Sequence, residues 1–150
     1  MAGVRTPTEL DVYKLSDELA HRVREVTDRA PFRRHEKLRE QMEEAAESPC
    51  SNIEEGFSRY LPGDNARFVR IAAGSLAELI RHLNRALARQ LISPKEHTEM
   101  RTLAKRALGA AVGYIVYLQS AEAPHLPKKR KAPRLRRRKR EPGPDEPMNP

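Results

Sequence analysis

The strongest chemical signal in the 150-residue sequence is a polycationic segment near its C-terminus. Ten lysines and arginines occur within the thirteen positions 128–140. This density suits a polyphosphate partner, because Lys and Arg displace the counterions of phosphates. Arg also forms bidentate hydrogen bonds to phosphate and stacks on bases. The segment therefore predicts nucleic-acid binding by Lys128, Lys129, Arg130, Lys131, Arg134, Arg136, Arg137, Arg138, Lys139 and Arg140.

The segment 128–140 contains no aromatic residue, so it offers no stacking platform for single-stranded bases. Sequence-specific readout by the segment alone is therefore not expected. Two other interpretations stay open: the segment binds an anionic membrane or protein, or it only keeps the chain soluble.

The charge of the chain is concentrated in its C-terminal part. Residues 123–150 contain ten basic and three acidic residues and seven of the twelve prolines. The preceding 122 residues carry 19 basic and 18 acidic groups, although the whole chain has a net charge of +8. Proline blocks helix propagation, and a segment with few large apolar groups cannot bury enough surface to offset its ordering entropy. We predict a folded domain over 1–122 and a disordered Arg/Lys/Pro-rich tail over 123–150.

Apolar residues in the folded domain recur every three or four positions in four stretches, which is the period of a helix and not of a strand. The first predicted helix begins at a capping box formed by Thr6 and Glu9, and it ends before Pro31. The second begins near Arg34 and contains Pro49, which would kink or break it. Because the apolar face keeps its phase across this proline, we favour one kinked helix over two shorter ones.

Two further helices follow a Pro-Gly turn. The third is predicted over 66–91, with Asp64 as its N-cap. The fourth follows a second capping box, in which Ser93 is the cap and Glu96 its partner, and it ends before Pro124. Short links between long amphipathic helices make neighbours antiparallel. We therefore predict an all-α fold, an up-down-up-down antiparallel four-helix bundle.

The third and fourth predicted helices carry a second group of cations. On one helix face these residues could form a phosphate-facing patch. The alternative is an ordinary charged helix exterior, because Glu78, Glu96 and Glu99 are close by in the sequence. The patch would consist of Arg81, Arg85 and Arg89, with Arg101, Lys105 and Arg106 beside them.

Three stretches of the domain carry recognisable motifs. Residues 12–16 read VYKLS, residues 48–59 read SPCSNIEEGFSR, and residues 68–79 read FVRIAAGSLAEL. Together they resemble the bacterial four-helix-bundle family of proteins encoded in intervening sequences of large-subunit ribosomal RNA. The accessory variability protein of diversity-generating retroelements is similar to this family.

The resemblance covers about residues 9–119. It implies a four-helix bundle, a ring-shaped homopentamer and nucleic-acid association without catalysis. In the retroelement relative, the bundle partners a reverse transcriptase and binds its RNA template. The chain departs from the family pattern at Glu54, where Ala is usual, and in its Arg-rich tail. The family binds nucleic acid through a basic body, whereas this body is nearly neutral, so we expect the tail to make the main contact.

The polar and small residues of these motifs have two interpretations. We expect them to fix helix register or a subunit interface. Two glutamates on facing helices could instead hold a metal, but such sites need Glu-x-x-His steps on the helices, and within the four predicted helices one pair, Glu18 and His21, has that spacing. The motif residues in question are Pro49, Asn52, Glu55, Gly56, Gly74, Ser75 and Glu78.

Glycines and apolar residues on the later helices suggest tight contacts. Glycine is costly inside a helix, so Gly74, Gly109 and Gly113 predict close approach of a neighbouring helix. The apolar residues 114–118 cover most directions around the fourth helix, and one bundle face cannot bury them all. This favours burial against another subunit.

Other chemistries find little support in the sequence. One cysteine cannot form an internal disulfide or a cysteine zinc site, and we expect Cys50 to be buried and inert. The five histidines are scattered, and no glycine-rich phosphate loop occurs. No apolar run is long enough for a membrane span, and no apolar signal segment opens the chain. We expect a cytoplasmic protein without a cofactor or a membrane partner.

These observations predict a non-enzymatic, oligomeric nucleic-acid-binding scaffold that favours RNA. The resemblance adds a pentameric ring and an accessory role to a reverse transcriptase of a diversity-generating retroelement. The alternative is a protein-binding adaptor whose basic tail only steers association.

Overall fold

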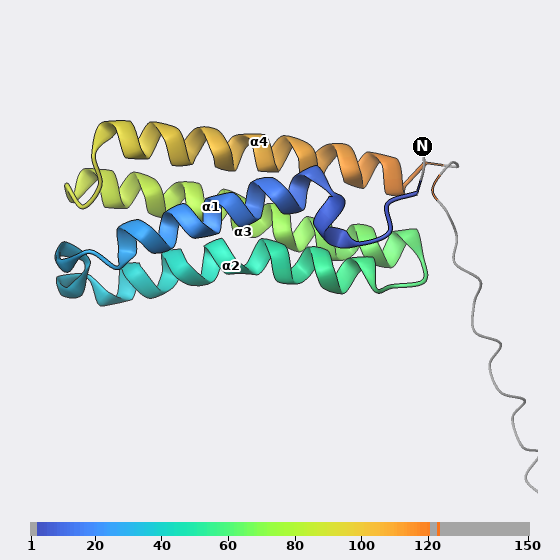
Figure 1. Ribbon diagram of the computed structural model, residues 1–150, viewed down its shortest axis with the longest axis horizontal. Coiled ribbons are helices and arrows are strands. Elements are labelled where there is room, and N and C mark those ends of the chain that lie inside the picture. Colours follow the sequence, from blue (N-terminus) through green and yellow to red (C-terminus); the bar gives the residue numbers. More distant parts are fainter. Residues whose placement is uncertain (1–2, 121–122, 124–150) are drawn as a thin grey trace, which may run out of the picture.

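The computed structural model describes residues 3–120 and residue 123, and it forms an antiparallel bundle of long helices (Figure 1). Successive helices run in opposite directions, so the predicted up-down-up-down bundle is confirmed, and the described residues include no strand. The elements are a 3-10 helix η1 (Pro7–Glu9), α1 (Asp11–Thr27), a 3-10 helix η2 (Ala30–Arg34), α2 (Glu36–Phe57), α3 (Pro62–Ala88) and α4 (Pro94–Leu118).

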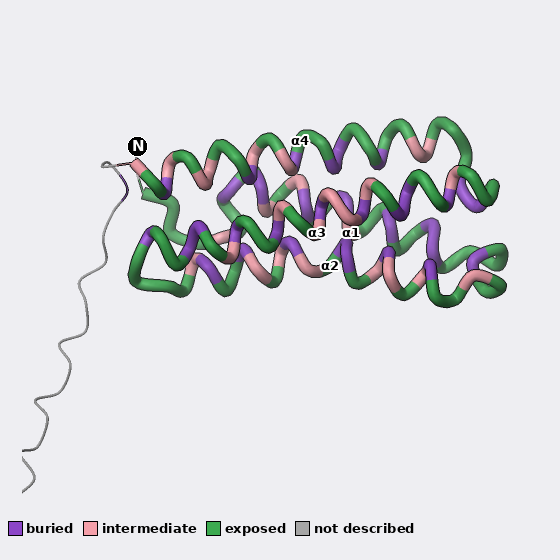
Figure 2. Tube along the Cα trace, turned by 180° about the vertical axis from the view of Figure 1, so that it is seen from behind, coloured by how far each residue is buried: buried purple, intermediate pink, exposed green. Residues whose placement is uncertain are grey.

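The helices contact one another in the ring order α1, α2, α3, α4, and each turns its apolar face inward (Figure 2). The core has two parts along the bundle. The larger part includes Phe32, Met42, Leu79 and Met100, and it lies toward the α1–α2 and α3–α4 connections. The smaller part surrounds Ile53 and lies toward the two chain ends. The buried side chains of the bundle therefore form two clusters along its length.

The first helix begins later than the capping-box prediction placed it. The Thr6 hydroxyl shares a 2.9 Å hydrogen bond with the Thr8 hydroxyl and does not cap a helix. Residues 7–9 form only a 3-10 turn, because the next residue, Leu10, is extended and its side chain packs into the core. Leu10 is then the N-cap of α1, which ends at Thr27, ahead of a second 3-10 turn that contains Pro31.

Three other predicted boundaries have clear outcomes. Helix α2 is one continuous helix through the buried Pro49. Asp64 is not the N-cap of α3. The N-cap is Leu61, whose backbone is extended, and Pro62 occupies the first helical position, where a backbone N–H would have no partner within the helix. Asp64 instead lies in the first turn, where its carboxylate complements the helix dipole. Helix α3 ends at Ala88, short of residue 91, and Gln90 with φ 59° turns the chain toward α4.

The capping box of α4 is present as predicted. Ser93 Oγ accepts a hydrogen bond from the Glu96 N–H at 3.1 Å, and Glu96 Oε1 accepts one from the Ser93 N–H at 2.9 Å. These two bonds satisfy backbone donors that a helix start otherwise leaves without partners.

The predicted close contacts at Gly74, Gly109 and Gly113 are not found among the described residues. A Cβ atom added at any of the three would meet no atom within 4 Å. The close approach occurs at Gly56, where an added Cβ would lie 2.6 Å from Asn65 Oδ1 and 2.9 Å from Phe68 Cβ. Gly56 therefore allows α2 and α3 to converge at their connection.

Candidate nucleic-acid interface

The nearly neutral body is electrically uneven. Helix α2 has seven acidic and two basic residues, whereas α3 and α4 each have two acidic and four basic residues. Because α3 and α4 are neighbours in the bundle, the positive charge gathers on one half of it. The net charge of the domain does not show this division.

The acidic residues of α4 face α1 rather than α3. Glu96 Oε2 lies 2.6 Å from Arg29 Nη2, and Glu99 Oε2 lies 3.1 Å from Arg22 Nη1. Hydrogen bonds from Arg29 and from the Ser93 backbone hold the pKa of Glu96 at about 2. These carboxylates are thus matched by Arg22 of α1 and by Arg29 of the α1–η2 connection, and they do not neutralise the cations near α3.

The contact between α3 and α4 carries several of those cations. His97 Nε2 lies 2.8 Å from Asn84 Oδ1, which fixes the register of the two helices. Arg81 is one turn before Asn84, and Arg101 is one turn after His97. Because the helices are antiparallel, both arginines lie on the same side of this hydrogen bond and at the same level of the bundle.

We name four exposed residues of this region the basic seam. None of them forms an ion pair with a carboxylate of residues 3–120. The neighbouring Glu78 is bonded instead to His82, at 3.1 Å. The seam therefore presents cations that a phosphate group could pair with. Its members are Arg81 and Arg85 on α3, and Arg101 and Lys105 on α4.

Arg89, the third predicted body residue, lies apart from the seam. It follows the end of α3, and its Nη1 donates to His35 Nδ1 at 3.4 Å. Arg89 therefore points to the start of α2. The structure brings Arg81 and Arg85 together with the cations of α4 and separates Arg89 from them.

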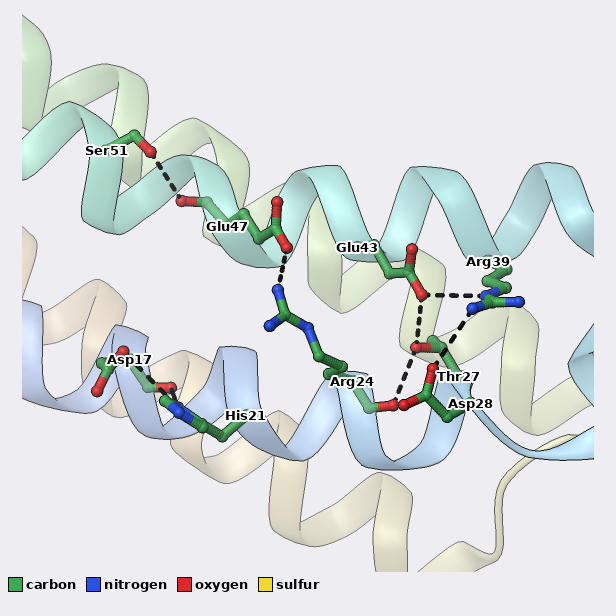
Figure 3. Close-up of polar contacts among 9 residues, drawn as sticks. All are labelled: Asp17, His21, Arg24, Thr27, Asp28, Arg39, Glu43, Glu47 and Ser51. Carbon is green, nitrogen blue, oxygen red and sulfur yellow. Dashed lines mark hydrogen bonds and ion pairs between the residues drawn. The ribbon is translucent and has the colours of Figure 1, made fainter.

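The contact between α1 and α2 shows the opposite pattern (Figure 3). Arg24 pairs with Glu47, while Arg39 Nε lies 3.1 Å from Glu43 Oε1. The hydroxyl of Thr27 also donates to Glu43 Oε1, at 2.9 Å. The arginines of this contact are occupied by carboxylates, so it is a poor site for phosphate.

The recognised motif residues mainly join α2 to α3. The hydroxyls of Ser48 and Ser75 share a 2.8 Å hydrogen bond between the two helices. Asn52 Nδ2 donates to both the carbonyl and the hydroxyl of Ser48, at 2.9 and 3.0 Å. With the buried Pro49 and the close approach at Gly56, these bonds fix the register of α2 against α3. Glu55 lies outside this contact and pairs with Arg59 of its own helix end, at 2.7 Å.

A family model of 23S rRNA-intervening sequence proteins matches residues 8–110. The chain belongs to this family. None of the curated proteins compared with it matches. No helix within the described part of the chain is long and apolar enough to cross a membrane.

The matched residues of this intervening-sequence protein, 8–110, include the motifs that join α2 to α3 and the basic seam. The polycationic segment 128–140 lies beyond it and outside the described residues, as does nearly all of the predicted tail. The chain leaves α4 at Leu118, which is 17 residues beyond Arg101. At 1.5 Å per helical residue, about 25 Å separate Arg101 from the end of α4.

Glu54, where this family member departs from the pattern, joins α2 to α1. Its Oε1 accepts a 2.9 Å hydrogen bond from the Tyr13 hydroxyl, which raises the pKa of Tyr13 to about 12. The nearby Cys50 is half-buried, and desolvation, with the charges of Asp17 and Glu54, raises its pKa to about 12. The thiol therefore stays protonated at neutral pH, which does not suit a nucleophile. Across the described residues, no three His, Cys, Asp or Glu side chains gather as a metal site would require.

Proposed function

We propose that this intervening-sequence protein is a non-enzymatic scaffold that binds nucleic acid, with RNA preferred to DNA. The observation that supports this most is the basic seam, whose four cations lack carboxylate partners among residues 3–120 while the glutamates of α4 pair with α1. The polycationic segment 128–140 supports it from the sequence side. The preference for RNA rests on the family resemblance.

Binding in this proposal is driven by the release of counterions from phosphates. Contacts to about six phosphates by the tail give a log–log salt slope near −4 on single strands. Three further phosphates on the seam add about −2.

Self-association is the second part of the proposal. Val112 and Val116 are exposed by 55% and 62%, and they lie on α4 beside Gly109 and Gly113, where an added Cβ would meet no atom of the described residues within 4 Å. A second copy that packs on this stripe would bury both valines and use the glycines for close approach. A closed ring, pentameric by the family resemblance, would repeat the seam and tail around an axis and increase avidity.

Replacing these valines tests the self-association. The double variant Val112→Glu/Val116→Glu should lower the mass measured by light scattering and keep the helical circular dichroism of the wild type. Thr98→Glu/Thr102→Glu places the same charges on exposed positions nearer the start of α4, and it should leave the mass unchanged. A wild-type chain that is monomeric at all concentrations contradicts this part of the proposal.

The same exposed stripe favours one other candidate function, a protein-binding adaptor. In that case a partner such as a reverse transcriptase covers Val112 and Val116, and the tail only steers the encounter. The adaptor predicts that the full chain binds neither RNA nor DNA at moderate salt.

Charge-neutralised full-length variants separate the contributions of seam and tail. The seam variant changes Arg81, Arg85 and Arg101 to Gln, and the tail variant changes the ten cations of 128–140 to Gln. The control changes Lys14, Arg24 and Lys37, three exposed cations of α1 and α2, to Gln. Fluorescence anisotropy with labelled single-stranded RNA and DNA should show the salt slope flattened by about 2 in the seam variant and by about 4 in the tail variant. Equal slopes for the seam variant and the control would remove the seam from the interface.

A further inference from the structure

A cavity of about 630 Å³ opens at the end of the bundle where the chain enters α1 and leaves α4. Its origin is the unequal length of the helices. Helix α1 has 17 residues, whereas α3 has 27 and α4 has 25, so the first residue of α1 does not reach this end of the bundle (Figure 1). The N-terminal residues 3–5 and the α2–α3 connection cover the space only in part. Its volume is within the range of small-molecule sites in proteins.

The walls of the cavity are mainly aromatic and apolar, with a few convergent polar groups. Tyr60, Tyr114 and Tyr117 line it, and the rings of Tyr114 and Tyr117 are nearly parallel, with centroids 6.3 Å apart. Asn65, only 7% exposed, donates from Nδ2 to the Tyr114 hydroxyl at 3.0 Å, and no described residue pairs with its Oδ1. Flat walls with an amide and hydroxyls suit a planar heteroaromatic group.

Two cations lie at the same cavity. Arg5 and Arg59 are exposed side chains among its lining residues, but Arg59 pairs with Glu55 at 2.7 Å, whereas Arg5 pairs with no carboxylate side chain of residues 3–120. Leu118, the last residue of α4, also lines it, and the polycationic segment begins ten residues further along the chain. An extended chain of that length spans at most about 35 Å, so a strand held by the tail is kept near the cavity.

We infer that this end cavity binds an unstacked nucleobase of the single-stranded nucleic acid, with Arg5 near a flanking phosphate. The inference rests on the proposed function. It supplies the aromatic contact that the polycationic segment lacks, because that segment contains no aromatic residue. The base stacks against the tyrosine walls, and its edge meets the Tyr114 hydroxyl.

Gly113 offers a way to fill the cavity without weakening the bundle. It lines the cavity, and an added Cβ would meet no atom within 4 Å. Gly113→Leu therefore places a large side chain in the cavity and also favours the helix. Gly109→Leu is the matched control, because Gly109 lies one turn earlier on α4 in equally open space but does not line the cavity. Both glycines belong to the exposed stripe proposed for self-association, so the two variants change that contact alike and differ in the cavity.

The test compares full-length chains binding a single-stranded RNA and an abasic oligonucleotide with the same backbone and length. We expect the wild type and Gly109→Leu to bind the base-containing strand about tenfold more tightly than the abasic strand. Gly113→Leu should bind both strands with the affinity that Gly109→Leu has for the abasic one. The salt slopes of the two variants should agree, because their phosphate contacts are the same.

Two results would overturn the inference. If the wild type binds both strands equally, with a steep salt slope, the proposed function stands and the cavity does not bind a base. If Gly113→Leu keeps the preference of the wild type, the base is bound elsewhere and the cavity has another occupant, such as Leu126 or Leu135 of the chain itself. Failure of the wild type to bind either strand at low salt would instead refute the proposed function, and the inference would fall with it.

Discussion

Gly56→Ala should destabilise the bundle, although alanine is normally the better residue inside a helix. The added Cβ would lie 2.6 Å from Asn65 Oδ1, 2.9 Å from Phe68 Cβ and 3.0 Å from the Asn65 carbonyl oxygen. Two of these neighbours are a backbone atom and a Cβ, which cannot rotate away, so α2 and α3 must separate. Overpacking of this kind costs about 1–3 kcal/mol. The higher helix propensity of alanine offsets less than about 1 kcal/mol of this cost, because Gly56 is one residue from the end of α2.

Gly74→Ala is the matched control for this effect. Gly74 lies inside α3, and its added Cβ meets nothing within 4 Å, so the substitution should stabilise the protein by about 0.5–1 kcal/mol. Urea denaturation followed by circular dichroism at 222 nm measures both variants. We expect the free energy of unfolding of Gly56→Ala to be about 2–3 kcal/mol below that of Gly74→Ala. Equal stability of the two variants would refute the role of Gly56 in helix approach.

Three further predictions concern the titratable groups. The Cys50 thiol, with its pKa near 12, should react with a thiol reagent at pH 8 far more slowly in the folded chain than in urea, and equal rates would contradict its burial. Glu96 has its pKa lowered to about 2 beside Arg29, so its contribution to stability is present above pH 4.5 and lost as the pH falls toward 2. Glu96→Gln should therefore cost about 1 kcal/mol in urea denaturation at pH 7, since the pair is partly exposed, and the difference should vanish near pH 2. The Tyr13 hydroxyl should ionise near pH 12, and Glu54→Ala should lower this pKa, as seen at 295 nm in difference spectra against Tyr13→Phe.

The helices could be predicted from the sequence because their signals are local. A step of three or four between apolar residues needs only the chain itself, and the Ser93–Glu96 capping box is a contact within one turn. Local signals are less decisive where a helix starts. The same Thr-Pro-x-Glu pattern at Thr6 gives a 3-10 turn, because Leu10 packs into the core in an extended conformation.

The rotation of each helix about its axis was harder to predict. Phe68 and Ile71 of α3 fit the apolar period of a helix face, but Phe68 is half-buried and Ile71 is 45% exposed. Val69 is buried in their place. Both sets fit a helical period, and only the packing against α2 and α4 selects one. The pairing of Glu96 with Arg29 depends on the same rotation, so the seam could be suspected from the sequence but not distinguished from a neutralised surface.

No sequence pattern predicted the end cavity. Its walls come from residues 3–12, 57–65 and 110–118, which only the bundle brings together. The difference in length between α1 and α4 could have suggested an open end, had the start of α1 been placed at Asp11.

The salt dependence of RNA binding by the full chain tests the central claim most directly. We predict that the chain binds single-stranded RNA at low salt, and that the logarithm of the association constant falls with a slope near −6 over roughly a fivefold range of salt. A slope of that size requires both the seam and the tail. Absence of binding at the lowest salt, or binding with a slope near zero, would contradict the account of this protein as a nucleic-acid scaffold.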